Sequence, residues 1–185
     1  MSQGKTRRDF IRSSLLLGGA LSSPLVFAQQ AGGRVQNKLD QLGIELPPTP
    51  APVANYVAYQ VAGNMAYIAG QIPFLNGELI YPGKVPRDVT VEQAQIAARQ
   101  CVINMISALK GACDGNLDRV KQCVRLQGFV ASDDSFTGQS TVINGASNLM
   151  VDVFGDAGKH TRLAIGVNTL PLNACVEVSG IFYID

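Results

Sequence analysis

Two charged residues near the end of the chain, Arg162 and Glu177, have the charge and shape to hold an anion and to move a proton. They lie on strands expected at 161–167 and 175–184, which we take as neighbours. Alternation then places both on one face of a sheet. The rest of that face is small, formed by Ala164, Gly166, Cys175 and Ser179. Small neighbours leave space for a shallow anion pocket.

A guanidinium can clamp a carboxylate through two hydrogen bonds, and a carboxylate can activate water. Arg162 and Glu177 together would suffice to hydrolyse an already electrophilic carbon. An ordinary cross-strand ion pair would give the same pattern and contribute little. Both interpretations stay open at this point. On the opposite faces, Leu163, Ile165 and Val167 and their counterparts Val176 and Val178 are expected to lie under helices.

Other chemistries have weak support in the residues. The only histidine, His160, stands in the polar turn 158–160, where a solvated side chain is expected. No C-x-x-C spacing and no glycine-rich phosphate loop occur, so neither a metal nor a nucleotide cofactor is implied. We expect the four cysteines to be buried thiols, because a domain of this length closes without disulfides. They are Cys101, Cys113, Cys123 and Cys175.

Residues 1–28 have the pattern of a removable twin-arginine export signal. Arg7 and Arg8 precede an apolar run that ends in Val26-Phe27-Ala28, with small residues at the cleavage spacing. A disordered basic tail is the alternative. The run contains Arg12 and Pro24, so this segment is not expected to span a membrane itself. No membrane span is expected after its cleavage either. We therefore predict a periplasmic or otherwise exported protein.

Removal of this segment takes away four of 15 basic residues and one of 14 acidic residues, which leaves 11 basic and 13 acidic residues. A nucleic-acid-binding surface needs clustered positive charge, and no such cluster is visible. No nucleic-acid partner is therefore predicted. A ribonuclease is further disfavoured by the single histidine.

The mature chain divides into a lead at 29–54 and one domain at 55–185. The lead combines a flexible start, a short helix at 35–42 and an extended stretch with four prolines. In the domain, a β-hairpin precedes two helices at 90–109 and 140–154, with strands between and after them. Val120, Val124, Leu126 and Val130 are expected on the buried face of the strand at 120–130. This order predicts an α+β fold: a mixed sheet with both helices on one face. The other face is open, so an oligomer is expected.

Short motifs spread over 36–184 resemble the RidA family, also called YjgF, in a less characterised branch. Their order and spacing carry the likeness: Asn55-Tyr56-Val57, Gly63-Asn64-Met65, Gly70-Gln71-Ile72-Pro73, Val142-Ile143-Asn144-Gly145, Arg162, Leu170-Pro171 and Val176-Glu177-Val178. The resemblance implies a chorismate-mutase-like fold assembled as a homotrimer with clefts between subunits. It also implies hydrolysis of reactive 2-aminoacrylate-type enamines and imines to 2-keto acids and ammonia, without cofactor. A historical name for part of the family is endoribonuclease L-PSP.

The resemblance assigns roles to five residues of this chain. Arg162 matches the carboxylate-binding arginine, Glu177 the acidic residue beside the attacking water, and Gly70 the glycine that admits the ligand to the backbone. Tyr56 and Asn144 match the cleft tyrosine and asparagine. Two departures remove polar groups: Ala164 stands where well-studied deaminases have cysteine, and Ala69 where they have serine.

The resulting hypothesis is an exported 2-iminobutanoate/2-iminopropanoate deaminase-like hydrolase that acts on a small carboxylate substrate. The alternative is a non-catalytic trimer of the same fold that binds a small carboxylate or a partner. Ala164 and Ala69 favour the alternative, because each loses a group that could position water.

Overall fold

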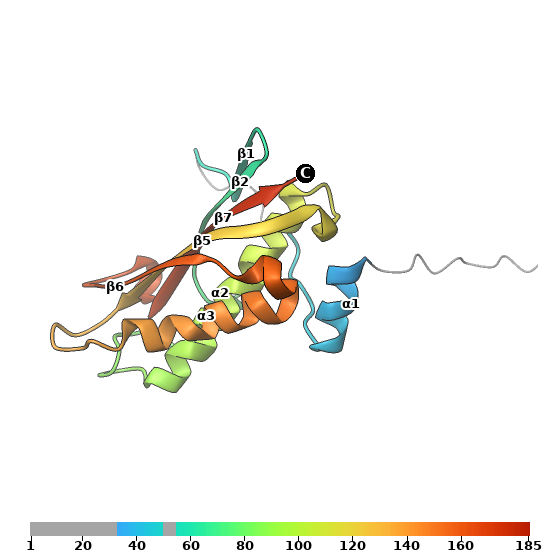
Figure 1. Cartoon of the computed structure of the whole chain (residues 1–185). Helices are drawn as coiled ribbons and strands as arrows, with labels where there is room; N and C mark the ends of the chain where they lie inside the picture. Colours follow the sequence, from blue (N-terminus) through green and yellow to red (C-terminus); the bar gives the residue numbers. More distant parts are fainter. Residues whose placement is uncertain (1–32, 50–54) are drawn as a thin grey trace, which may run out of the picture. The chain divides into compact units, whose positions relative to one another are not determined.

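The computed structural model describes residues 33–49 and 55–185, which belong to one compact unit (Figure 1). The predicted export signal and residues 50–54 of the proline-rich lead lie outside the described residues. Within the described part, no helix is long and apolar enough to cross a membrane.

A five-stranded mixed sheet is the centre of this unit. Its spatial order is β1-β2-β7-β5-β6, and all pairs are antiparallel except β5 with β6, which are parallel. The strands are β1 (Tyr59–Ala62), β2 (Met65–Gln71), β5 (Val120–Ala131), β6 (Thr161–Val167) and β7 (Val176–Ile184). A separate small hairpin is formed by β3 (Phe74–Leu75) and β4 (Glu78–Leu79). The expected α+β class is confirmed.

Two long helices, α2 (Val91–Ala112) and α3 (Gln139–Phe154), cover one face of the sheet, as predicted (Figure 1). Thr90 caps α2 through a capping box with Gln93, because each side chain accepts from the other residue's backbone N–H. Helix α3 is the crossover that joins parallel strands β5 and β6. The connection places one side of α3 over the edge strand β6.

The described part of the lead packs on the same unit. Helix α1 (Arg34–Gln41) buries Val35 and Leu39 completely. The Asp118 carboxylate, in the short 3₁₀ helix η1 (Leu117–Arg119), accepts from the backbone N–H groups of Arg34 at 2.8 Å and Val35 at 2.9 Å. These are donors that the first turn leaves unsatisfied, so a distant side chain serves as the helix cap.

The strand β5 departs from the expected alternation at two points. The pairing with β7 shifts register between Val120 and Gln122 and again between Cys123 and Arg125, so Cys123 is buried and Val124 is 37% exposed. The prediction that Val124 faces the core was therefore wrong, because the first shift reverses the faces of the residues that follow it and the second restores them. Val120, Leu126 and Val130 are buried as predicted.

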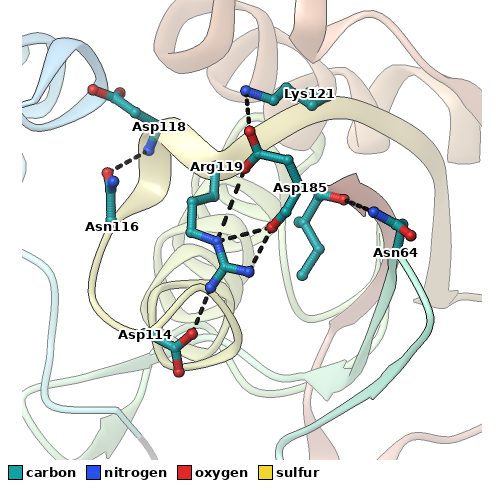
Figure 2. A network of polar contacts seen from close by, with 8 residues as sticks. Asn64, Asp114, Asn116, Asp118, Arg119, Lys121 and Asp185 are labelled. Carbon is teal, nitrogen blue, oxygen red and sulfur yellow. Dashed lines mark hydrogen bonds and ion pairs between the residues drawn. The ribbon is translucent and has the colours of Figure 1, made fainter.

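The end of β7 is tied to the start of β5 by charged side chains (Figure 2). Arg119 Nε donates to the main-chain oxygen of Asp185 at 2.9 Å, and Lys121 Nζ lies 2.6 Å from the Asp185 carboxylate. The Asn64 amide donates to the main-chain oxygen of Ile184 at 3.1 Å. These groups are largely exposed, and we assign them an anchoring role rather than a chemical one.

All four cysteines are buried and unpaired thiols, as predicted. Burial raises the pKa of Cys101 well above its ordinary value, that of Cys113 and Cys175 to about 11, and that of Cys123 to about 12. The thiolate is the reactive form of cysteine, so native thiols should be inert at neutral pH.

We therefore expect less than one thiol per chain to react with Ellman's reagent in the native protein, and four after unfolding in guanidinium chloride. The native protein must be assayed at pH 8, where an exposed thiol would react within minutes. Rapid native labelling of one or more thiols would contradict the burial that the structure shows.

Candidate functional site

Arg162 and Glu177 lie on opposite faces of the sheet, contrary to the prediction from alternation. Strand β5 separates β6 from β7, so the two strands are not neighbours. Arg162 pairs with Leu126, which pairs with Gly180; Glu177 pairs with Phe129, which pairs with Ile165. Paired residues share a face, and positions 126 and 129 differ by an odd number. One protomer therefore cannot bring the two charges together.

The face that carries Arg162 is the face under the helices. Its neighbours Ala164 and Gly166 pair with Gly128 and Val130, which are buried. Leu163, Ile165 and Val167, predicted to lie under helices, are instead on the open face. Strand alternation separates two sets of residues but does not say which set is covered, and here the crossover through α3 decides it.

The Arg162 guanidinium is held against α3. Its Nη1 donates to Asn144 Oδ1 at 2.8 Å and to Ser147 Oγ at 3.2 Å. Thus the structure brings together two residues that the sequence singled out separately, Arg162 and Asn144. Arg162 is exposed at the sheet edge, where a ligand could reach it.

Ser147 and His160 extend this contact and were missed as site residues. Ser147 Oγ lies 3.0 Å from His160 Nε2, and His160 Nδ1 lies 2.6 Å from the carbonyl oxygen of Gly158. The prediction of a solvated histidine was wrong: the ring is half-buried and hydrogen-bonded at both nitrogens. The pattern contained part of the signal, since 144 and 147 share a helix face and His160 directly precedes the strand that carries Arg162.

Glu177 lies on the open face, beside Gly70 of β2. A methyl group built on Gly70 would lie 1.8 Å from Glu177 Oε1 and 3.1 Å from its Cγ. Glycine at this position leaves the space that the Glu177 side chain occupies in this orientation. The Glu177 carboxyl is half-buried, and desolvation raises its pKa above the ordinary value. A carboxylate shifted toward neutral pH is suited to proton transfer.

Tyr56 and Gly70 line a cavity of about 1080 Å³ between the lead and α2. Tyr56 is 61% exposed. Arg99, Gln100 and Asn104 of α2 supply polar groups to the wall, and Ile44, Leu46, Pro47 and Pro48 of the lead supply apolar ones. Neither Arg162 nor Glu177 is among the lining residues. The five predicted residues thus form two groups within one protomer: Arg162 with Asn144, and Gly70 with its neighbour Glu177 and with Tyr56 of the same cavity.

A metal centre has no ligand set in the part of the chain that the structure describes: nowhere there do three histidine, cysteine, aspartate or glutamate side chains converge. Separately, the Arg162 guanidinium has the donors that a carboxylate can bind, and the Glu177 carboxyl, whose pKa is raised, is a group that can exchange a proton.

Comparison with known proteins places this architecture. The family described as YjgF/chorismate mutase-like, putative endoribonuclease matches residues 36–183. Protein TCP17 from Trypanosoma cruzi is 44% identical over 152 residues, which cover 82% of this chain and 94% of TCP17.

Two solved structures are similar over most of their length. The protein Atu1372 of unknown function from Agrobacterium tumefaciens has a TM-score of 0.77 at 42% identity. The match covers 82% of this chain and 93% of the Atu1372 chain. A putative endoribonuclease from Shewanella oneidensis has a TM-score of 0.78 at 35% identity. That match covers 81% of this chain and 99% of the Shewanella chain. Sequence and fold agree over the same region, and the chain belongs to the YjgF/chorismate mutase-like family.

Proposed function

We propose that this protein is an exported hydrolase that converts reactive enamines and imines of the 2-aminoacrylate type to 2-keto acids and ammonia. The observation that carries the proposal is the guanidinium of Arg162, held by one nitrogen against α3 and accessible from solvent. Export rests on residues 1–28 alone, which lie outside the described residues.

The proposed reaction uses water and no cofactor. An enamine first tautomerises to the iminium form, whose carboxylate binds Arg162. Glu177 removes a proton from water, and the hydroxide oxygen forms a bond to the iminium carbon. The tetrahedral amino alcohol then expels ammonia as the C–N bond breaks, and the carbonyl of the 2-keto acid forms. The proton on Glu177 passes to the amine nitrogen before the C–N bond breaks, and the hydroxyl proton goes to the released ammonia as the carbonyl forms, so that the products are the 2-keto acid and ammonium.

Arg162 and Glu177 must come from two different copies of the chain to line one site, because within one protomer they lie on opposite faces of the sheet. A second copy would also cover the open face, where Tyr67, Ile165 and Tyr183 are 45%, 39% and 44% exposed. Exposed apolar groups of this size favour association. The proposal therefore includes a homotrimer in which Arg162 of one copy and Glu177 with Gly70 of the next line one cleft.

The experiment is a coupled assay on residues 29–185. A lyase generates 2-aminoacrylate in the cuvette, and the loss of the imine and the release of ammonia are followed with and without the protein. Acceleration over the spontaneous hydrolysis supports the proposal. No acceleration on imines derived from serine, threonine or alanine contradicts it. Sizing by light scattering in the same buffer tests the trimer.

The pH dependence of the reaction should report the ionisation of the Glu177 carboxyl. As a base it must be ionised, so kcat/KM should rise with pH through the Glu177 pKa, which desolvation places above the ordinary glutamate value. In Glu177→Gln we expect the activity and this limb to be lost. The measurement is the pH profile of kcat/KM for wild type and Glu177→Gln. An unchanged acid limb in Glu177→Gln would assign the titration to another group.

Stability should respond to the same group with the opposite sign. A carboxyl whose pKa is raised by folding binds more protons in the folded state, so its ionisation destabilises that state as pH rises. Glu177→Gln should therefore unfold at a higher temperature than wild type at pH 8, and the difference should vanish below pH 4. A lower melting temperature at pH 8 would contradict desolvation as the cause of the shift.

A non-catalytic carboxylate-binding trimer is the second candidate. It is favoured by Ala69 and Ala164, which leave no side-chain hydroxyl or thiol at two positions near the proposed cleft. This candidate predicts thermal stabilisation by simple 2-keto acids without turnover of any imine.

A further inference from the structure

A chain of hydrogen bonds runs from a backbone carbonyl to the Arg162 guanidinium. The Gly158 carbonyl oxygen can only accept, so His160 Nδ1 carries the hydrogen at this 2.6 Å contact. In the neutral ring His160 Nε2 is then the acceptor, and the Ser147 hydroxyl donates to it at 3.0 Å. With its hydrogen used, Ser147 Oγ presents lone pairs to Arg162 Nη1 at 3.2 Å.

The two hydrogens of Arg162 Nη1 are both engaged, one by Ser147 and one by Asn144 Oδ1 at 2.8 Å. By contrast, Nε and Nη2 make no hydrogen bond or ion pair with any residue of 33–49 or 55–185. A guanidinium has five N–H donors in a rigid fork, and the Nε–Nη2 edge offers two parallel donors to one carboxylate.

We infer that Ser147 and His160 are positioning residues, which fix the plane of the Arg162 guanidinium so that its Nε–Nη2 edge faces the carboxylate of the ligand. His160 sets the direction of the Ser147 hydroxyl, and Ser147 with Asn144 sets the orientation of the guanidinium. This inference rests on the role proposed above for Arg162. It adds that the ligand carboxylate binds side-on, to Nε and Nη2.

The contacts of Ser147 and Asn144 with Arg162 also restrict the conformational freedom of the arginine side chain. Arg162 is on an edge strand and exposed, so its long side chain has rotamer freedom that a ligand would have to remove. Contacts from α3 and from the turn before β6 remove part of that freedom before the ligand arrives. Loss of Ser147 should therefore weaken ligand capture more than it slows the chemical step.

The first test needs no ligand. Nitrogen-detected NMR of the full mature trimer should show one histidine, since the chain has only one, in the Nδ1–H form. The Arg162 guanidinium, assigned by its absence in Arg162→Lys, should rotate slowly about its Nε–Cζ bond. Ser147→Ala should speed this rotation and shift the His160 nitrogens, and Ser147→Thr, which keeps the hydroxyl, should restore both. Rotation as fast in wild type as in Ser147→Ala overturns the inference.

The second test uses pyruvate as the probe for binding and 2-aminoacrylate as the substrate. Ser147→Ala should raise the pyruvate Kd and the KM by about 3- to 10-fold with kcat nearly unchanged, as expected for one lost hydrogen bond that acts through another group. His160→Gln, whose amide can donate and accept, should retain more affinity than His160→Ala. The control is Asn148→Ala, exposed on the same helix, which should change nothing.

The two proposals fail in different ways. If no imine is hydrolysed but the guanidinium rotation depends on Ser147, the positioning role stands and the hydrolase proposal falls. If imines are hydrolysed and Ser147→Ala leaves the rotation, Kd and KM as in wild type, the hydrolase proposal stands and the positioning role falls.

Discussion

Arg162→Ala should lower kcat/KM for 2-aminoacrylate-type imines by roughly 10- to 150-fold. The reason is that a hydrogen bond between charged partners contributes about 1.5–3 kcal/mol, and 1.4 kcal/mol is a factor of ten. The side chain is exposed, so the variant should fold and unfold like wild type. The coupled imine assay measures the rate.

Arg162→Lys is the matched control. Lysine keeps the positive charge and lacks the two-donor fork, so it should retain an intermediate rate. Equal rates for wild type and Arg162→Ala would mean that Arg162 does not bind the substrate. Equal losses in the alanine and lysine variants would assign the whole effect to the fork geometry.

Mixing two impaired variants tests the assembly directly. When Arg162→Ala and Glu177→Gln chains are co-refolded in equal amounts, about one quarter of the clefts in random trimers receive Arg162 from one copy and Glu177 from its neighbour. We expect about that fraction of wild-type activity to return. No recovery in verified mixed trimers would show that each site is built within one chain, against the opposite faces observed here.

Gly145→Ala should be the most damaging small substitution for stability. Gly145 lies where α3 crosses α2, and an added methyl carbon would lie 2.1 Å from the backbone oxygen of Gln95 and 3.0 Å from its Cα. Backbone atoms of a helix cannot move aside alone, so the two helices must separate. We expect a loss of about 1–3 kcal/mol, even though alanine is the better helix former.

Chemical and thermal unfolding measure this loss. In a domain of this size it corresponds to a fall in melting temperature of roughly 3–10 °C. Asn148→Ala, one turn further on the exposed side of α3, is the control and should change stability by less than about 0.5 kcal/mol. An unchanged melting temperature for Gly145→Ala would mean that the helices do not approach as closely as the structure shows.

The elements of the fold could be predicted because their signals are local. Thr90 and Gln93 mark the start of α2 within four residues, and residues 176–184 alternate clearly between buried and more exposed positions. The position of Val124 could not be predicted, because the two irregularities in β5 are a property of its pairing with β7. Local patterns contain no information about where a ladder slips.

The site divides in the same way. The sequence by itself determined which residues have the right chemistry, since Arg162, Glu177, Asn144, Gly70 and Tyr56 follow from residue type and family resemblance. It also contained the pair 144 with 147 on one face of a helix, and His160 two residues before Arg162. Nothing local joins a helix face to a strand face, so the contact of Ser147 with His160 and Arg162 could not be read from it.

Only the tertiary structure decided that Arg162 faces α3 and that Glu177 faces away from it. Alternation fixes which residues of a single strand share a face, but β6 and β7 are separated by β5. Arg162 pairs with Leu126 of β5 and Glu177 pairs with Phe129 of β5, and these two positions differ by an odd number of residues. Strand order and register arise from contacts distant in sequence. For that reason the sequence could identify the two charges, and the fold alone could show that they point in opposite directions.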